Sequence, residues 1–491
     1  MLERIKKRFT KNQVVTHSEI KDTSIYISTT LLIQVCNFII IPILWRKLTP
    51  ADFGIIAITE IIGQFIIIIL GLALDSSITR FYYEWPEENR KKYIGSIWLL
   101  SLSCNISIGL TLLLIFRLLG QYIFPEVSFY PYLLLGIIYY IFLSLNQFVL
   151  STIRIKKLSG LYAAHRTVFT ILKIGLNLYV VLILDKGVTG FLFSNALACL
   201  LTLVFGIVIM VYHASLSVNV SINKQCLKFS LPIVPSTLIK NTTLIMDKFI
   251  LQRYLSLDLL GIYSISSKFG LLVTNLYNAL KLSYLPHMLQ IVSSEDKQNI
   301  KKLSKSSLIY FAPIVILACL IILFIDEFVH IINREDYFAI VNYVPFLVSI
   351  NVISATYIFF TPGLFLSKRT DLMWIPTIIE LMSIIIGGYF LIRLFSLYGA
   401  ILAKFMSSVI FFLVSLFFSN KYYKLPIAWI RVLILVGIVW ISIIISIYLR
   451  QNQSVNAGWG LIVNILIMVC ISIIVISILL NRKIKPNTQR I

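Results

Sequence analysis

Charged side chains occur inside stretches of this sequence that are otherwise long and apolar. Three are acids, Glu60, Asp247 and Glu380, and the basic residues are more numerous: Arg166, Lys173, Lys240, Lys248, Lys268 and Lys404. A charge at the centre of a bilayer costs about 2.5–3.5 kcal/mol, so such a residue usually marks a cavity or a pathway. Because the basic residues outnumber the acids, the surplus predicts a site for an anionic ligand.

The stretch around Lys240 is the most polar of these segments. Ser236, Lys240, Thr243 and Asp247 recur at three- and four-residue steps, so they share one face of a helix. Lipid cannot solvate that face, and therefore water or another helix must cover it. Basic and amide side chains that could act with Lys240 follow the same logic and are predicted to bind ligand: Arg166, Lys173, Lys268, Lys404, Gln34, Asn37, Asn275 and Asn278.

A structural interpretation competes with this one. The intramembrane charges can neutralise one another in pairs, for instance Glu60 with Lys268, Asp247 with Lys248 and Glu380 with Lys404. The same acids are candidates for binding a coupling ion, since a carboxylate inside a membrane can take up H+ or Na+. We therefore group Glu60, Asp247, Lys248 and Glu380 as candidate gating or ion-coupling residues.

The composition determines the fold class that must position these side chains. Of 491 residues, 58% are hydrophobic and 13% are charged, with a mean hydropathy of +0.91. A soluble protein could not hide this much apolar surface. The chain is predicted to be an all-α polytopic membrane protein with about fourteen transmembrane helices. They are expected at roughly 24–46, 53–73, 94–118, 131–151, 161–184, 188–212, 228–252, 259–281, 306–326, 341–366, 372–394, 398–419, 427–449 and 458–480.

The net charge of +22 has a simple cause in a membrane protein, because cytoplasmic loops collect Lys and Arg. Basic runs fall on alternate connections, among them Arg90–Lys92 and Arg154–Lys157. The alternation predicts that both termini are cytoplasmic, and no nucleic-acid partner is needed to explain the charge. The longest connection, roughly 282–305, is expected to be a polar linker too short for a folded catalytic domain.

Two stretches repeat. "ADFGIIAITEIIG" (51–63) and "DLLGIYSISSKFG" (258–270) share a Gly-Ile pair, a later isoleucine and a closing glycine at one spacing. "TGFLFSNALACL" (189–200) and "YGAILAKFMSSV" (398–409) echo at nearly the same offset. The repeats predict two pseudo-symmetric six-helix lobes around a central cavity, as in parallel-repeat transporters. The expected divisions are 1–212 for the N-terminal lobe, 213–424 for the C-terminal lobe, and 425–491 for an additional helix pair and tail.

Catalytic and cofactor motifs are sparse. The six cysteines lie in or beside apolar segments without a CxxC pair, which is typical of core residues. The sequence lacks a Walker-type glycine loop and metal-ligand spacing among its histidines, so neither a metal nor a cofactor is expected. Polar residues of one outer loop, 327–340, are expected to be solvated, with a catalytic cluster as the alternative: His330, Arg334, Glu335 and Asp336.

Motifs along nearly the whole chain resemble one family. "LTPADFGIIAI", "GLALDSSITRFYYE" (71–84), "FSLPIVPSTL" (229–238), "MDKFILQRYLSLDLLGIYSISSKFG" (246–270) and "YGAILAKFMSS" (398–408) are similar to the polysaccharide-export and O-antigen flippases. These belong to the multidrug/oligosaccharidyl-lipid/polysaccharide exporter superfamily. Where the family usually has an aspartate and an arginine before "Phe-Ile-Leu", this chain has Asp247 and Lys248.

The resemblance implies a transporter, and no enzyme, of the bacterial inner membrane. Its implied substrate is an undecaprenyl-pyrophosphate-linked oligosaccharide, as in O-antigen, lipopolysaccharide or capsule synthesis, carried between leaflets by alternating access. Membrane lipids, and contact with the polysaccharide polymerase machinery, are further implied partners. Arg80 in the "DSSITRFY" stretch would either contact an entering pyrophosphate or anchor its loop near Asp75 and Glu84.

Three other classes compete with this interpretation. A multidrug cation antiporter of the same superfamily would need acids lining its cavity, whereas this chain has a basic surplus. A membrane-embedded polymerase or glycosyltransferase would need a larger outer loop. A scaffold without transport would not need polar faces at mid-membrane.

Overall fold

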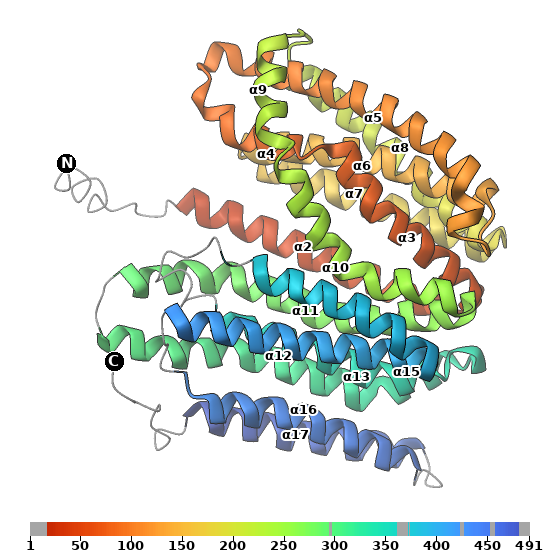
Figure 1. Cartoon of the computed structure of the whole chain (residues 1–491), viewed down its shortest axis with the longest axis vertical. Coiled ribbons are helices and arrows are strands. Elements are labelled where there is room, and N and C mark those ends of the chain that lie inside the picture. Colours follow the sequence, from red (N-terminus) through yellow and green to blue (C-terminus); the bar gives the residue numbers. More distant parts are fainter. Residues whose placement is uncertain are drawn as a thin grey trace. The chain divides into compact units, whose positions relative to one another are not determined.

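A computed structural model describes residues 17–293, 297–360, 372, 374–422, 427–451 and 457–480. Within these ranges every element of secondary structure is helical, which confirms the predicted all-α class (Figure 1). Eleven of the helices are long and apolar enough to cross a membrane. Both ends of the chain, 1–16 and 481–491, and the end of the span expected at 341–366 lie outside the described residues.

The chain folds as two compact units. The first contains residues up to Lys47 and Ile62–Thr237, and the second contains Leu48–Ile61 and Leu238 onward. Two helices, α3 (Pro50–Gly71) and α10 (Ile233–Tyr254), therefore contribute residues to both units. The sequence-based divisions at 212 and 424 stay predictions.

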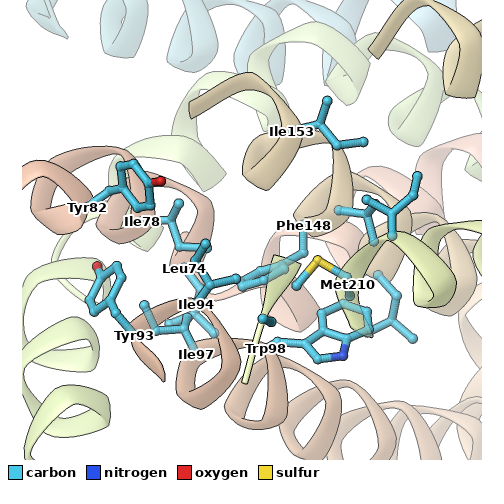
Figure 2. Packing of buried hydrophobic residues seen from close by; sticks show 14 of the residues in the cluster. Leu74, Ile78, Tyr82, Tyr93, Ile94, Ile97, Trp98, Phe148, Ile153 and Met210 are labelled. Carbon is cyan, nitrogen blue, oxygen red and sulfur yellow. The ribbon is translucent and has the colours of Figure 1, made fainter. Parts of the chain in front are cut away.

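The first unit is built from long helices joined by short turns. Its other elements are α2 (His17–Leu44), α4 (Leu74–Phe81), η1 (Tyr82–Glu84), α5 (Glu87–Ile123), η2 (Phe129–Leu133), α6 (Leu134–Ile155), α7 (Ser159–Asn177), η3 (Leu178–Ile183), α8 (Gly187–His213) and α9 (Val220–Ser230). Large apolar side chains from α4, α5, α6 and α8 meet in one core (Figure 2). Trp98, Phe148 and Met210 are nearly inaccessible there, so close packing among their side chains holds the helices together.

The second unit is a layered set of helices. Its other elements are α11 (Leu257–Ser293), α12 (Lys297–Ile332), η4 (Glu335–Tyr337), α13 (Ile340–Ala355), η5 (Thr356–Phe359), α15 (Trp374–Tyr422), α16 (Trp429–Gln451) and α17 (Ala457–Leu480). The helix pair α16 and α17 packs against α12, where Asn464 Nδ2 donates to the Leu323 carbonyl at 3.0 Å.

Local sequence explains where α3 begins. Thr49 and Asp52 form a reciprocal cap, in which the Asp52 carboxylate accepts from the Thr49 backbone N–H at 2.8 Å. The Thr49 hydroxyl in turn accepts from the Asp52 backbone N–H at 3.3 Å. Pro50 occupies the first turn, where a missing N–H costs nothing. The cap and Pro50 thus fix the start of α3, two residues after Leu48, where the first segment of the second unit begins.

The expected span boundaries agree with the structure at some places and differ at others. The two spans expected at 372–394 and 398–419 are the two arms of α15, because the chain leaves helical geometry between them at Ser396 (φ 53°, ψ −128°). The span expected at 228–252 begins only at Ile233, because the chain turns at Leu231 and Pro232 after α9. Proline lacks the N–H that would continue the helix. In α2 the apolar portion is only Ser28–Leu44.

The prediction of a polar linker at 282–305 is wrong. Helix α11 continues to Ser293 and α12 begins at Lys297, so most of this polar segment is helical. Loss of hydropathy marks where a span leaves the apolar layer, but a helix does not have to end there. The outer segment 327–340 is also partly helical, since α12 extends to Ile332.

Candidate functional site

Charged side chains of four helices meet in the second unit. Glu60 comes from α3, Asp247 and Lys248 from α10, Lys268 from α11 and Lys404 from α15. Two ion pairs connect them: Lys268 Nζ lies 3.2 Å from Glu60 Oε1, and Lys404 Nζ lies 2.5 Å from Asp247 Oδ2. Lys248 also interacts electrostatically with all four other charges. The five residues, called the charge cluster below, form one electrostatic unit with a formal charge of +1.

A close helix crossing brings α3 and α11 together at the repeated stretches. A Cβ on Gly54 would lie 2.2 Å from the Leu257 carbonyl oxygen, and a Cβ on Gly261 would lie 1.8 Å from that of Pro50. Only glycine permits backbones to approach this closely. Six residues after Gly54 and seven after Gly261, the side chains of Glu60 and Lys268 form their ion pair. The repeat therefore positions one half of the charge cluster.

Helix α10 carries the most deeply buried part of the charge cluster. Asp247 is 3% exposed and accepts a hydrogen bond from the Tyr263 hydroxyl at 2.7 Å. Lys248 is 9% exposed, and its Nζ lies 3.3 Å from the Ser264 hydroxyl oxygen. Burying an ionised group requires partners that replace water. The ion pair and the two hydroxyl contacts provide those partners.

One predicted pairing was wrong and another is seen. Glu60 pairs with Lys268 as the structural interpretation expected, but Lys404 pairs with Asp247 instead of with Glu380. The hydrogen bond between Lys248 and Asp247 uses the Lys248 backbone N–H, which lies 2.9 Å from Asp247 Oδ1. Glu380 on α15 is half-buried and interacts electrostatically with Lys404. Glu380 therefore lies beside the charge cluster but does not make the expected ion pair with Lys404.

The polar face predicted on α10 runs from exposed to buried. Ser236 and Lys240 are exposed, whereas Thr243 and Asp247 are buried. Thr243 donates its hydroxyl hydrogen to the Ile239 carbonyl at 3.0 Å, which satisfies that polar group within the helix. Lys240 therefore lies at an open position, while Asp247 belongs to the interior.

Helix α11 continues a polar face beyond Lys268. Asn275 is half-buried and Asn278 is exposed, at spacings that follow Lys268 around the same side of the helix. Lys281 lies one turn further, and its ammonium is within the electrostatic field of Lys240. Two like charges from α10 and α11 thus repel each other, which leaves this part of the unit positively charged.

In the first unit, α2 and α7 pack together and bring the other predicted polar residues near one another. Lys173 Nζ lies 3.5 Å from Asn37 Oδ1, and Asn37 donates its amide hydrogen to the Ile33 carbonyl at 2.9 Å. Gln34 and Arg166 are half-buried on the same two helices. We describe this group within its own unit, as a second polar and basic patch.

Arg80 lies apart from both groups. It forms an ion pair with Glu84, four residues later, and its guanidinium lies 5.4 Å from the centre of the Phe81 ring. Both partners are local, as expected for a residue that anchors its loop. The outer polar residues are also locally paired: Arg334 lies 2.9 Å from Asp336, and His330 lies 3.8 Å from Asp326 on α12.

Sequence reasoning missed three members of the site: Tyr263, Ser264 and Lys281. Tyr263 and Ser264 lie inside the repeated stretch 258–270, but the repeat is defined by its glycines and isoleucines and does not include these two positions. Their polar atoms, in the middle of an apolar segment, were the available signal, because a buried hydroxyl requires a partner. Lys281 was missed because it falls at the predicted end of its span. Within the described residues, no group of three His, Cys, Asp or Glu side chains could hold a metal ion.

Comparison with solved structures identifies the fold. The lipid II flippase MurJ, in an inward closed conformation, superposes with a TM-score of 0.70, covering 92% of this chain and 98% of that one, at 16% sequence identity. An inward-facing multidrug resistance MATE family transporter of the MOP superfamily superposes with a TM-score of 0.58, covering 79% of this chain and 94% of that one, at 14% identity. The protein therefore shares its fold with these membrane transporters.

Comparison of sequences identifies a relative of this chain and the family to which it belongs. An uncharacterized membrane protein of Haemophilus influenzae is 26% identical over 190 residues, which are 38% of this chain and 44% of that protein. The match thus spans less than half the length of this relative. The family model described as "Polysaccharide biosynthesis protein" matches residues 20–292, more than half of the chain. This multi-pass membrane protein belongs to the polysaccharide biosynthesis protein family.

Proposed function

We propose that the protein is a flippase that carries a lipid-linked oligosaccharide, an undecaprenyl-pyrophosphate-linked repeat unit, from the cytoplasmic to the outer leaflet of the bacterial inner membrane. The family supplies the polysaccharide context, and MurJ supplies a precedent for a lipid-linked substrate on this fold. The observation that carries the proposal is the excess of lysines on α10, α11 and α15 over the carboxylates paired with them.

The chemistry of a pyrophosphate fits these lysines. It carries about two negative charges, and ammonium groups in a medium of low dielectric constant bind phosphate oxygens strongly. Lys240 and Lys281 would attract the pyrophosphate first, because they repel each other in its absence. The ammonium groups of Lys268 and Lys404 would then each donate hydrogen bonds both to their carboxylate partner and to the phosphate oxygens. Asn275 and Asn278, on the same face of α11, would hydrogen-bond the sugar.

We assign binding of the same substrate to the polar and basic patch of the first unit, which consists of Gln34, Asn37, Arg166 and Lys173. A parallel-repeat transporter alternates the side of the membrane to which its substrate site opens. The oligosaccharide would cross in a polar environment while the lipid tail remains in the bilayer.

Glu380 is our candidate for the coupling residue. It lies beside Lys404 without forming the ion pair, so its protonation changes the charge sensed by the charge cluster without breaking a contact there. With Glu380 protonated, the charge cluster keeps its charge of +1 and attracts the anion. With Glu380 ionised, its charge and that of the charge cluster sum to zero, which weakens the attraction for the anion and favours its release. Asp247, held by Lys404 and Tyr263, is assigned a structural role instead.

The drug-antiporter alternative derives its support from the shared fold with the MATE transporter. A cation would be attracted by carboxylates that are not already neutralised. In the charge cluster both carboxylates form ion pairs with lysines, so the site favours an anion.

The first prediction concerns the lysines. A Lys240→Ala, Lys268→Ala double variant should lose transport by about tenfold or more, because each charge-assisted hydrogen bond contributes about 1.5–3 kcal/mol. Transport is measured by complementation of polysaccharide export in a deletion strain and by flipping of the lipid-linked oligosaccharide in proteoliposomes. The matched control is Lys224→Ala, Lys228→Ala, which removes two exposed charges from α9. Full activity of the Lys240, Lys268 variant would refute the assignment.

The second prediction concerns Glu380. Glu380→Gln mimics the protonated acid, so the variant should bind the lipid-linked oligosaccharide as the unmodified protein does but should no longer respond to the proton gradient. Binding is measured in detergent, and flipping is measured in proteoliposomes with and without an imposed pH difference. Flipping by the variant that still depends on the pH difference would exclude Glu380 as the coupling residue.

A further inference from the structure

Three basic residues gather at one end of the first unit, away from the groups described above. Lys91 lies in the first turns of α5, Lys156 directly follows α6, and His213 ends α8. Lys156 Nζ lies 2.9 Å from His213 Nδ1, and the charge of Lys91 acts on both groups. The Lys91 ammonium also lies 5.9 Å from the centre of the Tyr212 ring. We call these three residues the basic triad.

The fold holds the basic triad in place. The same helices, α5, α6 and α8, supply Tyr93, Ile153 and Met210 to the apolar core, each within three residues of a triad member (Figure 2). The backbone N–H of Ser215 donates to the Lys91 carbonyl at 2.9 Å, which ties the start of α5 to the segment after α8. The three side chains are therefore brought together by a rigid base and not by flexible loops.

Nothing in the described part of the chain neutralises the basic triad. None of its three side chains forms an ion pair with a carboxylate, and Glu87, on the same helix as Lys91, pairs with Arg90 at 3.2 Å. Burial lowers the pKa of the Lys156 amino group, and the charge of Lys91 lowers that pKa further. This arrangement stores repulsion that a bound anion would relieve.

The hydrogen-bonding groups of the basic triad match the same kind of ligand. When Lys156 is protonated, its ammonium can only donate, so His213 Nδ1 accepts from it and the imidazole proton lies on Nε2. The groups left over are then all donors: two ammonium groups and one imidazole N–H. A ligand that satisfies them must present several acceptors on one centre, as a phosphate does.

An apolar surface lies beside the basic triad. Along α8, Val208 is 63% exposed and Val211 is 62% exposed, and Leu216, after the helix, is 63% exposed. Helix α8 has 27 residues and is about 40 Å long at 1.5 Å per residue, longer than the hydrocarbon layer of about 30 Å. The helix is therefore long enough for one end to reach the depth of the lipid headgroups, and the exposed Val208 and Val211 lie within five residues of His213 at that helix's end.

We propose that Lys91, Lys156 and His213 bind the phosphate of an anionic phospholipid whose acyl chains lie along α8 at Val208 and Val211. The triad supplies the charge and the donors, and the exposed valines supply a surface that only a lipid would cover. A soluble phosphate would use the triad but would gain nothing from the apolar surface. This site is independent of the proposed transport site, and its occupant is a resident membrane lipid.

The test counts bound lipids on the purified full chain by native mass spectrometry, with phosphatidylglycerol and phosphatidylcholine as probes. A Lys91→Gln, Lys156→Gln variant should bind phosphatidylglycerol about tenfold or more weakly, since each lysine near an anionic headgroup contributes about 1 kcal/mol. Phosphatidylcholine binding should not change. The matched control, Lys224→Gln, Lys228→Gln, should retain phosphatidylglycerol, and Lys91→Arg, Lys156→Arg should do so too.

Two results would overturn the proposal. One is equal binding of phosphatidylglycerol by the triad variant and by the α9 control. The other is displacement of the phosphatidylglycerol by millimolar inorganic phosphate, which would assign the triad to a soluble anion. The arginine variant separates loss of charge from loss of fold, because it keeps the charge while it changes the same two positions.

Discussion

At the scale of single residues, the amino-acid types showed which side chains require partners but not which partners they find. Lys404 was expected near Glu380 and instead pairs with Asp247, which comes from another helix. The choice depends on the rotation of α10 and α15 about their axes, and that rotation is fixed by packing across the whole unit. Tyr263, which completes the shell of Asp247, was hidden for the same reason.

The pair of Asp247 and Lys404 yields a prediction about stability. Asp247→Asn should lower the free energy of unfolding by about 3–5 kcal/mol, because it leaves the Lys404 ammonium without its counter-charge. Adding Lys404→Met should restore part of that loss. Arg80→Gln, which removes an exposed ion pair with Glu84, should change the free energy by at most about 1 kcal/mol. Unfolding of the purified protein in detergent measures all three, and an Asp247→Asn protein as stable as Arg80→Gln would contradict this account.

At the scale of helices, the repeated glycines could be recognised from the sequence, but their use could not. Spacing indicated a duplication, whereas the structure shows that Gly54 and Gly261 let two backbones touch. The ends of α11 and α12 show the opposite problem. Hydropathy reports contact with lipid, so it could not reveal that the polar residues beyond the span continue the helix to Ser293.

The glycine crossing predicts unequal effects of one small substitution. Gly54→Ala and Gly261→Ala should each destabilise the protein by about 1–3 kcal/mol, because the new Cβ meets a backbone carbonyl that cannot turn away. Gly175→Ala in α7 and Gly437→Ala in α16 place their Cβ in open space and should be neutral or stabilising by up to about 1 kcal/mol. Thermal unfolding in detergent compares the four. Equal melting temperatures would rule out the close crossing.

At the scale of the whole molecule, composition and apolar length were sufficient for the all-α membrane class, which the fold comparison also shows. The number of spans was harder to predict. Among the described residues eleven helices satisfy length and hydropathy together; α10 is too polar to be among them, and the two expected spans of α15, separated at Ser396, count as one helix. The lysines that α10 carries lower its hydropathy, so a hydropathy criterion does not recognise it as a span.

The contact between the repeats is reciprocal. Gly54 approaches Leu257, four residues before Gly261, and Gly261 approaches Pro50, four residues before Gly54. A two-fold axis relating identical subunits generates this kind of mutual contact. The ion pair between Glu60 and Lys268 departs from this symmetry, because the positions that the repeat makes equivalent to them, Ser267 and Ile61, carry no charge.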